Sequence, residues 1–176
     1  NTSSLPIGKL AEGRASKGRF IGLHFFNPVE KMPLVEIVVA SCTSDETLAR
    51  AIDFVKQIKK TPIVVRDKPG FLVNRLLMPY LNEAAYLLAE GLRIDHIDRV
   101  ALKFGMPMGP LHLIDVVGLD VSEKVAMILK DAYGARMTPC PIFERLRKEG
   151  RLGQKNGKGF YIYSEKRLFP DEAIYA

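Results

Sequence analysis

Short apolar runs separated by turn signals organise the first 68 residues. The runs 20–26 and 34–39 predict two strands, the second rich in β-branched residues, and the run 62–65 predicts a third. Apolar residues recur at helical spacing over 43–59, and Ser44 is placed to cap that helix. This part of the chain therefore reads as strands joined by short connections and one helix.

The pattern changes after Pro69-Gly70, where apolar residues begin to recur three or four positions apart, as on one face of a helix. A long helix is expected over 72–88, ending near Gly91. The other expected segments are a helix capped by Asp95 and ended by Gly105, a turn at 106–110, helices over 111–117 and 121–133, a helix with Pro141 at its first position, and a short strand or extended tail at 160–163. The predicted fold class is α/β followed by an all-α part.

Composition excludes several classes of protein. The 176 residues are 47% hydrophobic and 26% charged, the balance of a globular domain. The sequence contains no run of about 18 apolar residues, the length that a membrane-crossing helix needs. Two cysteines are too few for a disulfide scaffold or a zinc site, and no metal site is expected. The net charge is +6, and the dense basic stretch 145–158 reads most simply as a solvated helix and turn, although the same charges would suit a phosphate-bearing cofactor or substrate. Nucleic acid is disfavoured, because no stacking aromatics interleave with the charges and tryptophan is absent.

Two polar residues stand inside the predicted strands. Glu36 lies in the apolar run 34–39, where burying a carboxylate is costly unless it is paired. If the first two strands form an antiparallel pair closed by residues 27–33, His24 faces Glu36 and both project to the same side of the sheet. A carboxylate behind an imidazole is the arrangement of a general base oriented by an acid. A lone histidine in a strand is more often a core residue, so the catalytic interpretation depends on this pairing.

Other candidate residues have an ordinary alternative. Asn74, near the start of the long helix, is either a capping or solvent-facing residue or a neutral donor for a substrate oxygen. Ser3 reads as a cap or turn residue. The glycine-rich segment 153–159, which holds Lys155, reads as a turn, because no strand precedes it and no helix follows it as a phosphate-binding motif requires.

Several motifs occur together, in order, over nearly the whole chain. They are Asn1-Thr2-Ser3-Ser4, Gly22-Leu23-His24-Phe25-Phe26-Asn27-Pro28, Met32-Pro33-Leu34-Val35-Glu36, Asp67-Lys68-Pro69-Gly70-Phe71-Leu72-Val73-Asn74-Arg75 and Pro107-Met108-Gly109-Pro110. As a set, and at these spacings, they resemble the L-3-hydroxyacyl-CoA dehydrogenase family. The segments 118–121 and 153–161 are most similar to the dehydrogenase part of the multifunctional fatty-acid β-oxidation α-subunit.

The resemblance implies an architecture and an activity. Residues 1–68 would be the C-terminal strands of a Rossmann-type NAD-binding domain, 69–165 a helical substrate and dimerisation domain, and 166–176 a tail or the start of a further segment. The implied reaction is the oxidation of L-3-hydroxyacyl-CoA to 3-ketoacyl-CoA in fatty-acid β-oxidation, with NAD as the cofactor.

The resemblance also implies roles for single residues. His24 would be the base that takes the hydroxyl proton, and Glu36 would orient and support it. Asn74, counted with the catalytic residues, and Ser3 would hydrogen-bond the substrate. Ser3, Asn27 and Lys155 would contact the nicotinamide cofactor.

One feature of the family is missing from this sequence. A Rossmann domain opens with G-x-G-x-x-G and carries an acidic residue about 20 positions later, and this chain has neither. Since the chain also does not begin with Met, we expect a fragment that is inactive alone and binds NAD weakly or not at all. Two alternatives stay open, a 3-hydroxybutyryl-CoA dehydrogenase and a non-catalytic helical assembly module.

The resemblance further implies partners and a location. We expect an acyl-CoA substrate and either a homo-oligomer or the hydratase and thiolase partners of a β-oxidation complex, with no nucleic acid and no membrane span. The location would be cytoplasmic in a bacterium, and mitochondrial or peroxisomal in a eukaryote.

Overall fold

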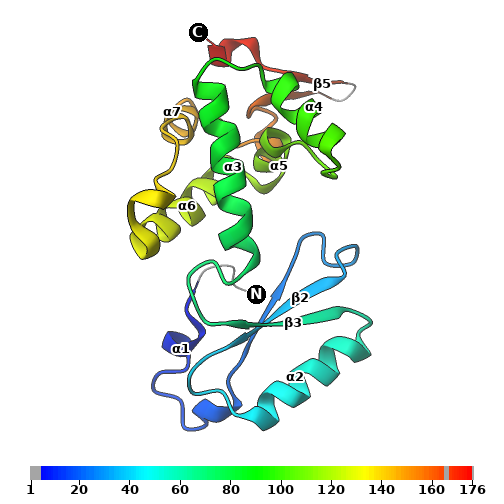
Figure 1. Cartoon of the computed structure of the whole chain (residues 1–176), viewed down its shortest axis with the longest axis vertical. Helices are drawn as coiled ribbons and strands as arrows, with labels where there is room; N and C mark the ends of the chain where they lie inside the picture. Colours follow the sequence, from blue (N-terminus) through cyan, green and yellow to red (C-terminus); the bar gives the residue numbers. More distant parts are fainter. Residues whose placement is uncertain (1–4, 165–166, 176) are drawn as a thin grey trace. The chain divides into compact units, whose positions relative to one another are not determined.

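The computed structural model describes residues 5–164 and 167–175, and the chain divides into two compact units, 1–75 and 76–176 (Figure 1). The first unit holds three strands and the second is mainly helical, as the change of sequence pattern near residue 70 predicts. The predicted fold class, an α/β part followed by an all-α part, is confirmed.

The first unit is a three-stranded sheet in the order β1 (Gly22–Phe25), β2 (Leu34–Val39), β3 (Thr61–Arg66). β1 and β2 are antiparallel, as the short connection between them requires. β2 and β3 are parallel, because helix α2 (Asp45–Gln57) returns the chain to the starting edge. The Ser44 hydroxyl accepts a hydrogen bond from the Thr47 N–H at 3.3 Å, so Ser44 caps this helix as predicted.

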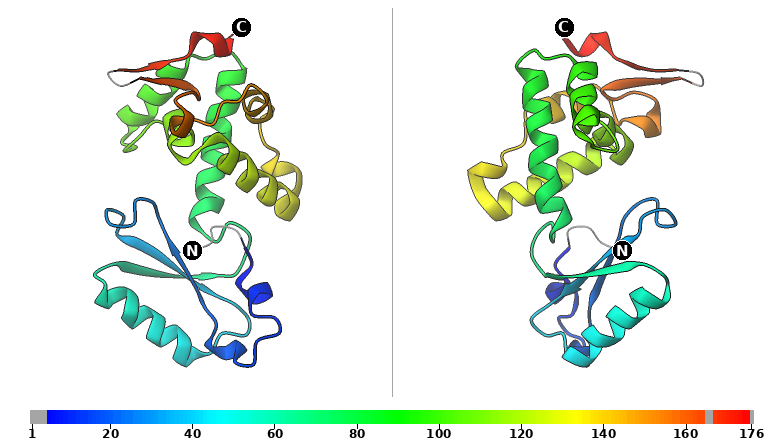
Figure 2. Two further views of the ribbon diagram at one scale, coloured as in Figure 1. Left: turned by 180° about the vertical axis from the view of Figure 1, so that it is seen from behind. Right: turned by 45° about the vertical axis from the view of Figure 1, so that its right-hand side comes forward.

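The two faces of this sheet carry different cores. Val35 and Ile37 of β2 pack with Ala51 and Val55 of α2, which lies along one face of the sheet in both views of Figure 2. The opposite face holds a second cluster of Ile7, Val38, Ala40, Val65 and Phe71. Because side chains alternate along a strand, Glu36 lies on the face opposite α2.

Short helical segments precede the sheet. They are α1 (Ile7–Leu10) and the 3₁₀ segment η1 (Lys17–Arg19). The Asp67 carboxylate, just after β3, accepts the Ile7 and Gly8 N–H groups at 2.9 and 2.8 Å. This carboxylate therefore ties the start of α1 to the end of β3.

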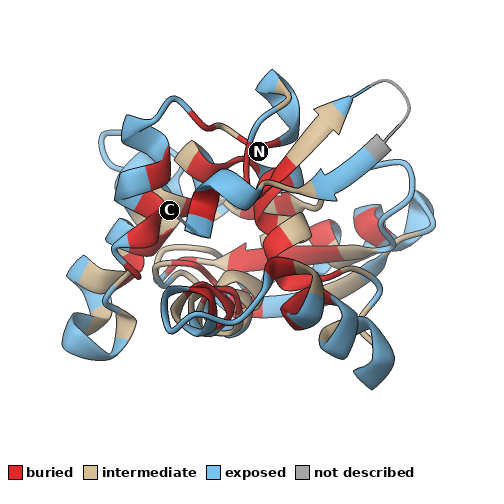
Figure 3. Cartoon of the chain, turned by 90° about the horizontal axis from the view of Figure 1, so that it is seen from above, coloured by how far each residue is buried: buried red, intermediate tan, exposed pale blue. Residues whose placement is uncertain are grey.

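The second unit is built from helices and a hairpin. Helix α3 (Val73–Ala89) begins in the first unit and continues into the second, where α4 (Ile94–Phe104), α5 (Pro110–Val117), α6 (Leu119–Tyr133) and α7 (Ile142–Lys148) gather around it (Figure 2). These helices carry buried and exposed positions on different faces (Figure 3). The remaining elements are η2 (Gly134–Met137), η3 (Gln154–Asn156), the antiparallel strands β4 (Tyr161–Ser164) and β5 (Arg167–Pro170), and η4 (Glu172–Tyr175).

The structure differs from the sequence-based expectation at several helix ends. Arg93, not Asp95, occupies the N-cap position of α4, and the Asp95 carboxylate pairs with the Arg93 side chain instead. Pro141 precedes α7 rather than opening it. Pro110, expected in the turn at 106–110, is instead the first residue of α5. The described residues from 167 onward, expected as a tail or the start of a further segment, form β5 and η4, and Ile174 is buried.

Two buried carboxylates join elements that are distant in the sequence of the second unit. Asp98 of α4 accepts the Leu111 and His112 N–H groups at 2.8 and 3.0 Å and so caps the start of α5. A Cβ on Gly109 would lie 2.2 Å from the Asp98 Cγ, which explains the glycine of the Pro-Met-Gly-Pro motif. The Tyr161 hydroxyl also donates to Asp98, at 2.7 Å, and thereby links β4 to α4.

Asp115, near the C-terminal end of α5, likewise joins distant elements. Its carboxylate accepts the Phe160 and Tyr161 N–H groups, both at 2.9 Å, and the Tyr163 hydroxyl at 3.2 Å. A Cβ on Gly159 would lie 2.0 Å from the Asp115 Oδ1, so the chain can approach the carboxylate only as glycine. Burial, which these hydrogen bonds only partly offset, raises the pKa of Asp115 to about 6.

The raised pKa of Asp115 predicts a pH dependence of stability. The folded-state pKa of Asp115 lies above the ordinary value of 3.8. The side chain therefore makes its full contribution to folding stability below pH 3.8, and this contribution is lost as the pH rises through about 6. At about 1.4 kcal/mol per pKa unit, the free energy of unfolding of the parent should fall relative to Asp115→Asn by about 2 kcal/mol between pH 4 and pH 7. Urea unfolding followed by circular dichroism measures this difference. Asp131→Asn, at an exposed position of α6, is the matched control, and a parent-to-variant difference that is the same at both pH values would contradict the prediction.

Candidate active site

The predicted register of the first hairpin is confirmed, and it brings His24 and Glu36 together. His24 of β1 is paired with Glu36 of β2, and the His24 Nδ1 lies 2.6 Å from the Glu36 Oε2. The two residues are 4% and 0% exposed. The strands therefore hold an imidazole and a carboxylate in contact and out of water, which answers the burial problem that Glu36 poses in the sequence.

The second oxygen of Glu36 binds the start of helix α3. Its Oε1 accepts the backbone N–H groups of Leu72 and Val73, each at 2.9 Å. Val73 is the first residue of this 17-residue helix, whose N-terminus favours a negative charge. One carboxylate thus holds both the imidazole and the beginning of the helix that carries Asn74.

These contacts fix the charge of Glu36. Burial by itself would raise its pKa, but the hydrogen bonds from His24 and from the Val73 and Leu72 N–H groups outweigh burial and lower the pKa below its ordinary value. Glu36 is therefore a carboxylate at neutral pH and can only accept hydrogen bonds. The Nδ1 of His24 must then carry a proton, and in the neutral ring Nε2 is the basic nitrogen.

Two aromatic rings contact the imidazole. The ring centroids of Phe26 and Phe71 lie 4.6 and 5.6 Å from that of His24, at interplanar angles of 57° and 58°. Such tilted contacts restrict rotation of the imidazole and exclude water from it. The arrangement as a whole is that of a general base whose tautomer and orientation are fixed by a buried acid.

The other predicted site residues stand in different places. Asn74 is the second residue of α3, partly buried and directly after Val73. Asn27 is exposed and follows β1, the strand that carries His24, by two positions. Ser3 lies outside the described residues. Lys155 belongs to the second unit, where its ammonium group pairs with the Asp120 carboxylate near the start of α6.

Sequence reasoning missed the residues that surround the pair. Leu72 and Val73 contribute backbone N–H groups, which leave no trace in the identity of a side chain. Phe71 contributes its ring. The available signal was the Gly70 position, since a glycine just before a helix marks a sharp turn that can aim the following N–H groups.

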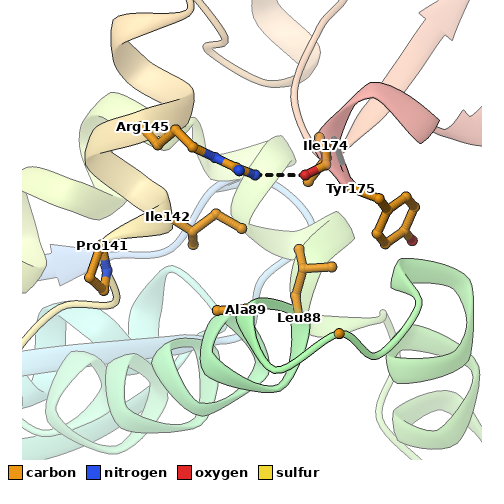
Figure 4. A pocket seen from close by; sticks show the side chains of 8 residues that line it. Leu88, Ala89, Pro141, Ile142, Arg145, Ile174 and Tyr175 are labelled. Carbon is orange, nitrogen blue, oxygen red and sulfur yellow. Dashed lines mark hydrogen bonds between the residues drawn. The ribbon is translucent and has the colours of Figure 1, made fainter.

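A pocket in the second unit has a different character. It has a volume of about 360 Å³ and lies where the end of α3 meets α7 and η4 (Figure 4). Arg145 is the sole charged residue among the described residues that line it, and its guanidinium donates to the Ile174 carbonyl at 2.7 Å. The remaining lining residues are Leu88, Ala89, Gly91, Pro141, Ile142, Ile174 and Tyr175. This lining offers no acid–base pair, so we place the candidate site at His24 and Glu36.

Comparison with protein families agrees with the division of the structure into an α/β part and a helical part. Residues 1–68 match the model of the 3-hydroxyacyl-CoA dehydrogenase NAD binding domain, and residues 70–163 match that of the 3-hydroxyacyl-CoA dehydrogenase C-terminal domain. The chain belongs to the 3-hydroxyacyl-CoA dehydrogenase family. The resemblance carried by the sequence motifs is thereby confirmed.

Individual members of the dehydrogenase family are similar over nearly the whole chain. The fatty acid oxidation complex subunit alpha of Shewanella sp. (strain ANA-3) is 50% identical over all of this chain and 26% of its own length. The (S)-3-hydroxybutyryl-CoA dehydrogenase structure from Ralstonia eutropha is 42% identical with a TM-score of 0.90, over 94% of this chain and 59% of that one. The 3-hydroxybutyryl-CoA dehydrogenase structure from Escherichia coli K12 is 37% identical with a TM-score of 0.88, over 95% and 36%. The chain thus spans about a quarter of the curated relative.

The lowered pKa of Glu36 predicts acid sensitivity of the first unit. Since the folded-state pKa lies below the ordinary value of 4.5, the stabilisation is present above pH 4.5 and is lost as the pH falls through the folded-state pKa. Glu36→Gln lacks this titration, so the parent's advantage in free energy of unfolding should be large at pH 7 and shrink steadily on acidification. Urea unfolding at a series of pH values checks it. Glu83→Gln, at an exposed position of α3, serves as the control, and an advantage that is independent of pH would refute the assignment.

Proposed function

We propose that this chain carries the catalytic pair of an NAD-dependent 3-hydroxyacyl-CoA dehydrogenase that oxidises L-3-hydroxyacyl-CoA to 3-ketoacyl-CoA in fatty-acid β-oxidation. The observation that carries the proposal is the buried 2.6 Å contact between the His24 Nδ1 and the Glu36 carboxylate. Membership of the dehydrogenase family and the match to its NAD binding domain support the reaction and the cofactor.

The pair suits the proton transfer in this reaction. Oxidation of a secondary alcohol removes the hydroxyl proton and the hydrogen on C3, and the electron pair of the O–H bond forms the new C=O bond. The His24 Nε2 takes the hydroxyl proton, because Nδ1 already holds a proton that it donates to Glu36. The imidazolium that results is stabilised by the Glu36 carboxylate behind it. The buried surroundings of both groups strengthen this attraction.

We also propose residues that would hold one end of the cofactor. Asn27 presents an exposed carboxamide just beyond β1, and ligands of Rossmann-type sheets bind near strand ends. Asn27, with Ser3 and Lys155, would hold the nicotinamide part of NAD, and the G-x-G-x-x-G turn that holds the pyrophosphate elsewhere in such folds is absent from this sequence. NAD, when bound, supplies the acceptor for the hydride from C3. A role for Lys155 requires its ammonium group to leave Asp120 or to bind both partners.

Asn74 is proposed as the residue that positions the substrate. It follows Val73, whose N–H is held by Glu36, so the carboxylate that orients the base also fixes the backbone beside Asn74. A neutral amide donor is suited to the substrate oxygen at C3, which stays uncharged in the alcohol and the ketone and gains negative charge as the proton leaves.

Fatty-acid oxidation is favoured over the narrower 3-hydroxybutyryl-CoA reaction by sequence identity. The chain is 50% identical to the fatty acid oxidation complex subunit alpha and 42% and 37% identical to the two 3-hydroxybutyryl-CoA dehydrogenases. The name of the first relative describes a subunit of a complex, and we propose hydratase and thiolase partners on that basis.

Removing either member of the catalytic pair in the full-length protein should lower turnover. His24→Ala deletes the base, and Glu36→Gln keeps the shape but removes the charge that stabilises the imidazolium. General-base catalysis is worth about 10²–10⁴-fold, so each change should lower kcat by at least about a hundredfold. The double variant should be little worse than His24→Ala alone, since the two groups act as a unit.

The measurement is the reduction of NAD, followed at 340 nm, at saturating L-3-hydroxyacyl-CoA. His96→Ala, at an exposed position of α4, is the matched control and should retain full turnover. Losses that multiply in the double variant, or a His24→Ala variant that keeps its turnover, would contradict the proposal.

The proposed role of Asn74 predicts a loss in catalytic efficiency. Asn74→Ala and the isosteric Asn74→Asp both remove the amide donor, and loss of one such donor typically costs about 10²–10³-fold in rate. We expect kcat/KM for the hydroxyacyl substrate to fall by at least a hundredfold in both variants, with the KM for NAD nearly unchanged. Steady-state kinetics separates the two constants. If Asn74→Asp matches the parent, donation by the amide is not required.

A further inference from the structure

Phe71 has an unusual backbone conformation for a buried aromatic residue. Its φ is 47°, in the left-handed region, and its side chain is 2% exposed. Lys59 is the other non-glycine residue with a positive φ among the residues that the structure describes, and it stands exposed just after α2, where left-handed residues commonly end helices. The left-handed conformation is sterically unfavourable for an L-residue, so the surroundings of Phe71 must hold it in place.

The turn before α3 and the core of the first unit supply that restraint. The Phe71 N–H donates to the Lys68 carbonyl at 2.8 Å and closes a turn through Pro69 and Gly70. The side chain belongs to the buried cluster that also contains Ile7, Val38, Ala40 and Val65. Glycine would adopt this φ without the steric cost. Phe71 therefore provides packing contacts that a glycine could not make, although its side chain strains the backbone at this φ.

Phe71 and the two residues after it contact different members of the His24–Glu36 pair. The Phe71 ring lies 5.6 Å, centroid to centroid, from the imidazole of His24. The two residues that follow it, Leu72 and Val73, donate their N–H groups to Glu36. The left-handed turn at Phe71 thus directs the backbone donors at the acid while the side chain contacts the base.

We propose that Phe71 is a positioning residue for the His24–Glu36 pair, an inference that rests on the function proposed above. The ring limits rotation of the imidazole, so that the Nε2 remains aimed at the substrate hydroxyl. The backbone of Phe71 keeps Glu36 oriented toward Nδ1. Strained backbone held at a reacting group is a means of keeping that group in one geometry before the substrate binds.

The test is to shorten the side chain in the full-length protein. Phe71→Leu keeps an apolar side chain but removes the ring, and Phe71→Met is the second variant should the first not fold. Misplacing a reacting group by about 1 Å can cost about a hundredfold in rate. We expect kcat to fall about ten- to a hundredfold in either variant, with the KM for each substrate within about threefold of the parent.

Two readouts separate positioning from a loss of core packing. Phe143→Leu removes the same atoms from a fully buried site in α7 of the second unit and should leave kcat unchanged. The Nδ1 proton of His24 is hydrogen-bonded to the Glu36 carboxylate, so we expect a strongly downfield proton NMR signal from it. Loss of this signal in His24→Ala identifies it. This signal should persist in Phe143→Leu and broaden or vanish in the folded Phe71 variants.

The outcomes distinguish this inference from the proposed function. A folded Phe71→Leu or Phe71→Met variant with kcat within twofold of the parent and an intact downfield signal would overturn the role of Phe71, and so would an equal loss in Phe143→Leu. If His24→Ala itself keeps its turnover, the proposed function has failed instead. Loss of turnover in His24→Ala together with full turnover in the Phe71 variants would refute the positioning role alone.

Discussion

The need to satisfy one buried carboxylate organises the first unit of this chain. Glu36 has no exposed surface, and an unpaired charge in that position would be far more costly than any single apolar contact could offset. Its two oxygens receive three donors, one from the His24 ring and two from the backbone before and at the start of α3. The donors come from two distant parts of the chain, β1 and the start of α3, so the strand register and the turn at Phe71 must both be correct.

The same physical solution recurs in the second unit. Asp98 and Asp115 are also buried, and each accepts two backbone N–H groups and a tyrosine hydroxyl. The three carboxylates differ in the direction in which their pKa is shifted. The pKa of Glu36 is lowered because its partners include an imidazole, whereas burial dominates at Asp98 and Asp115 and raises the pKa of both. An imidazole donor therefore distinguishes the carboxylate of the candidate site from the two that join helices to strands.

The sequence predicted the features that follow from local periodicity. The alternation in two strands was enough to place His24 opposite Glu36, and helical spacing located α3. Hydrogen bonds between residues far apart in the chain could not be predicted from this periodicity. Asp98 and Asp115 read like the exposed Asp131, because a carboxylate in a helix is usually solvated and their donors lie 13 to 63 residues away. Strand β5 was missed since its pairing with β4, not its own composition, makes it a strand.

The location of the donors shows which part of the chain the pair needs. His24, Glu36, Phe71 and the N–H groups of Leu72 and Val73 all lie within residues 1–75, the first compact unit. The tautomer of His24 follows from the charge of Glu36, and that charge follows from the same short list of donors. The donors to Glu36 named here and the rings of Phe26 and Phe71 that contact His24 therefore all belong to the first unit. Because α3 begins at one of these donors and continues through residue 89, the helix that starts at the His24–Glu36 pair is also the helix around which the second unit packs its core.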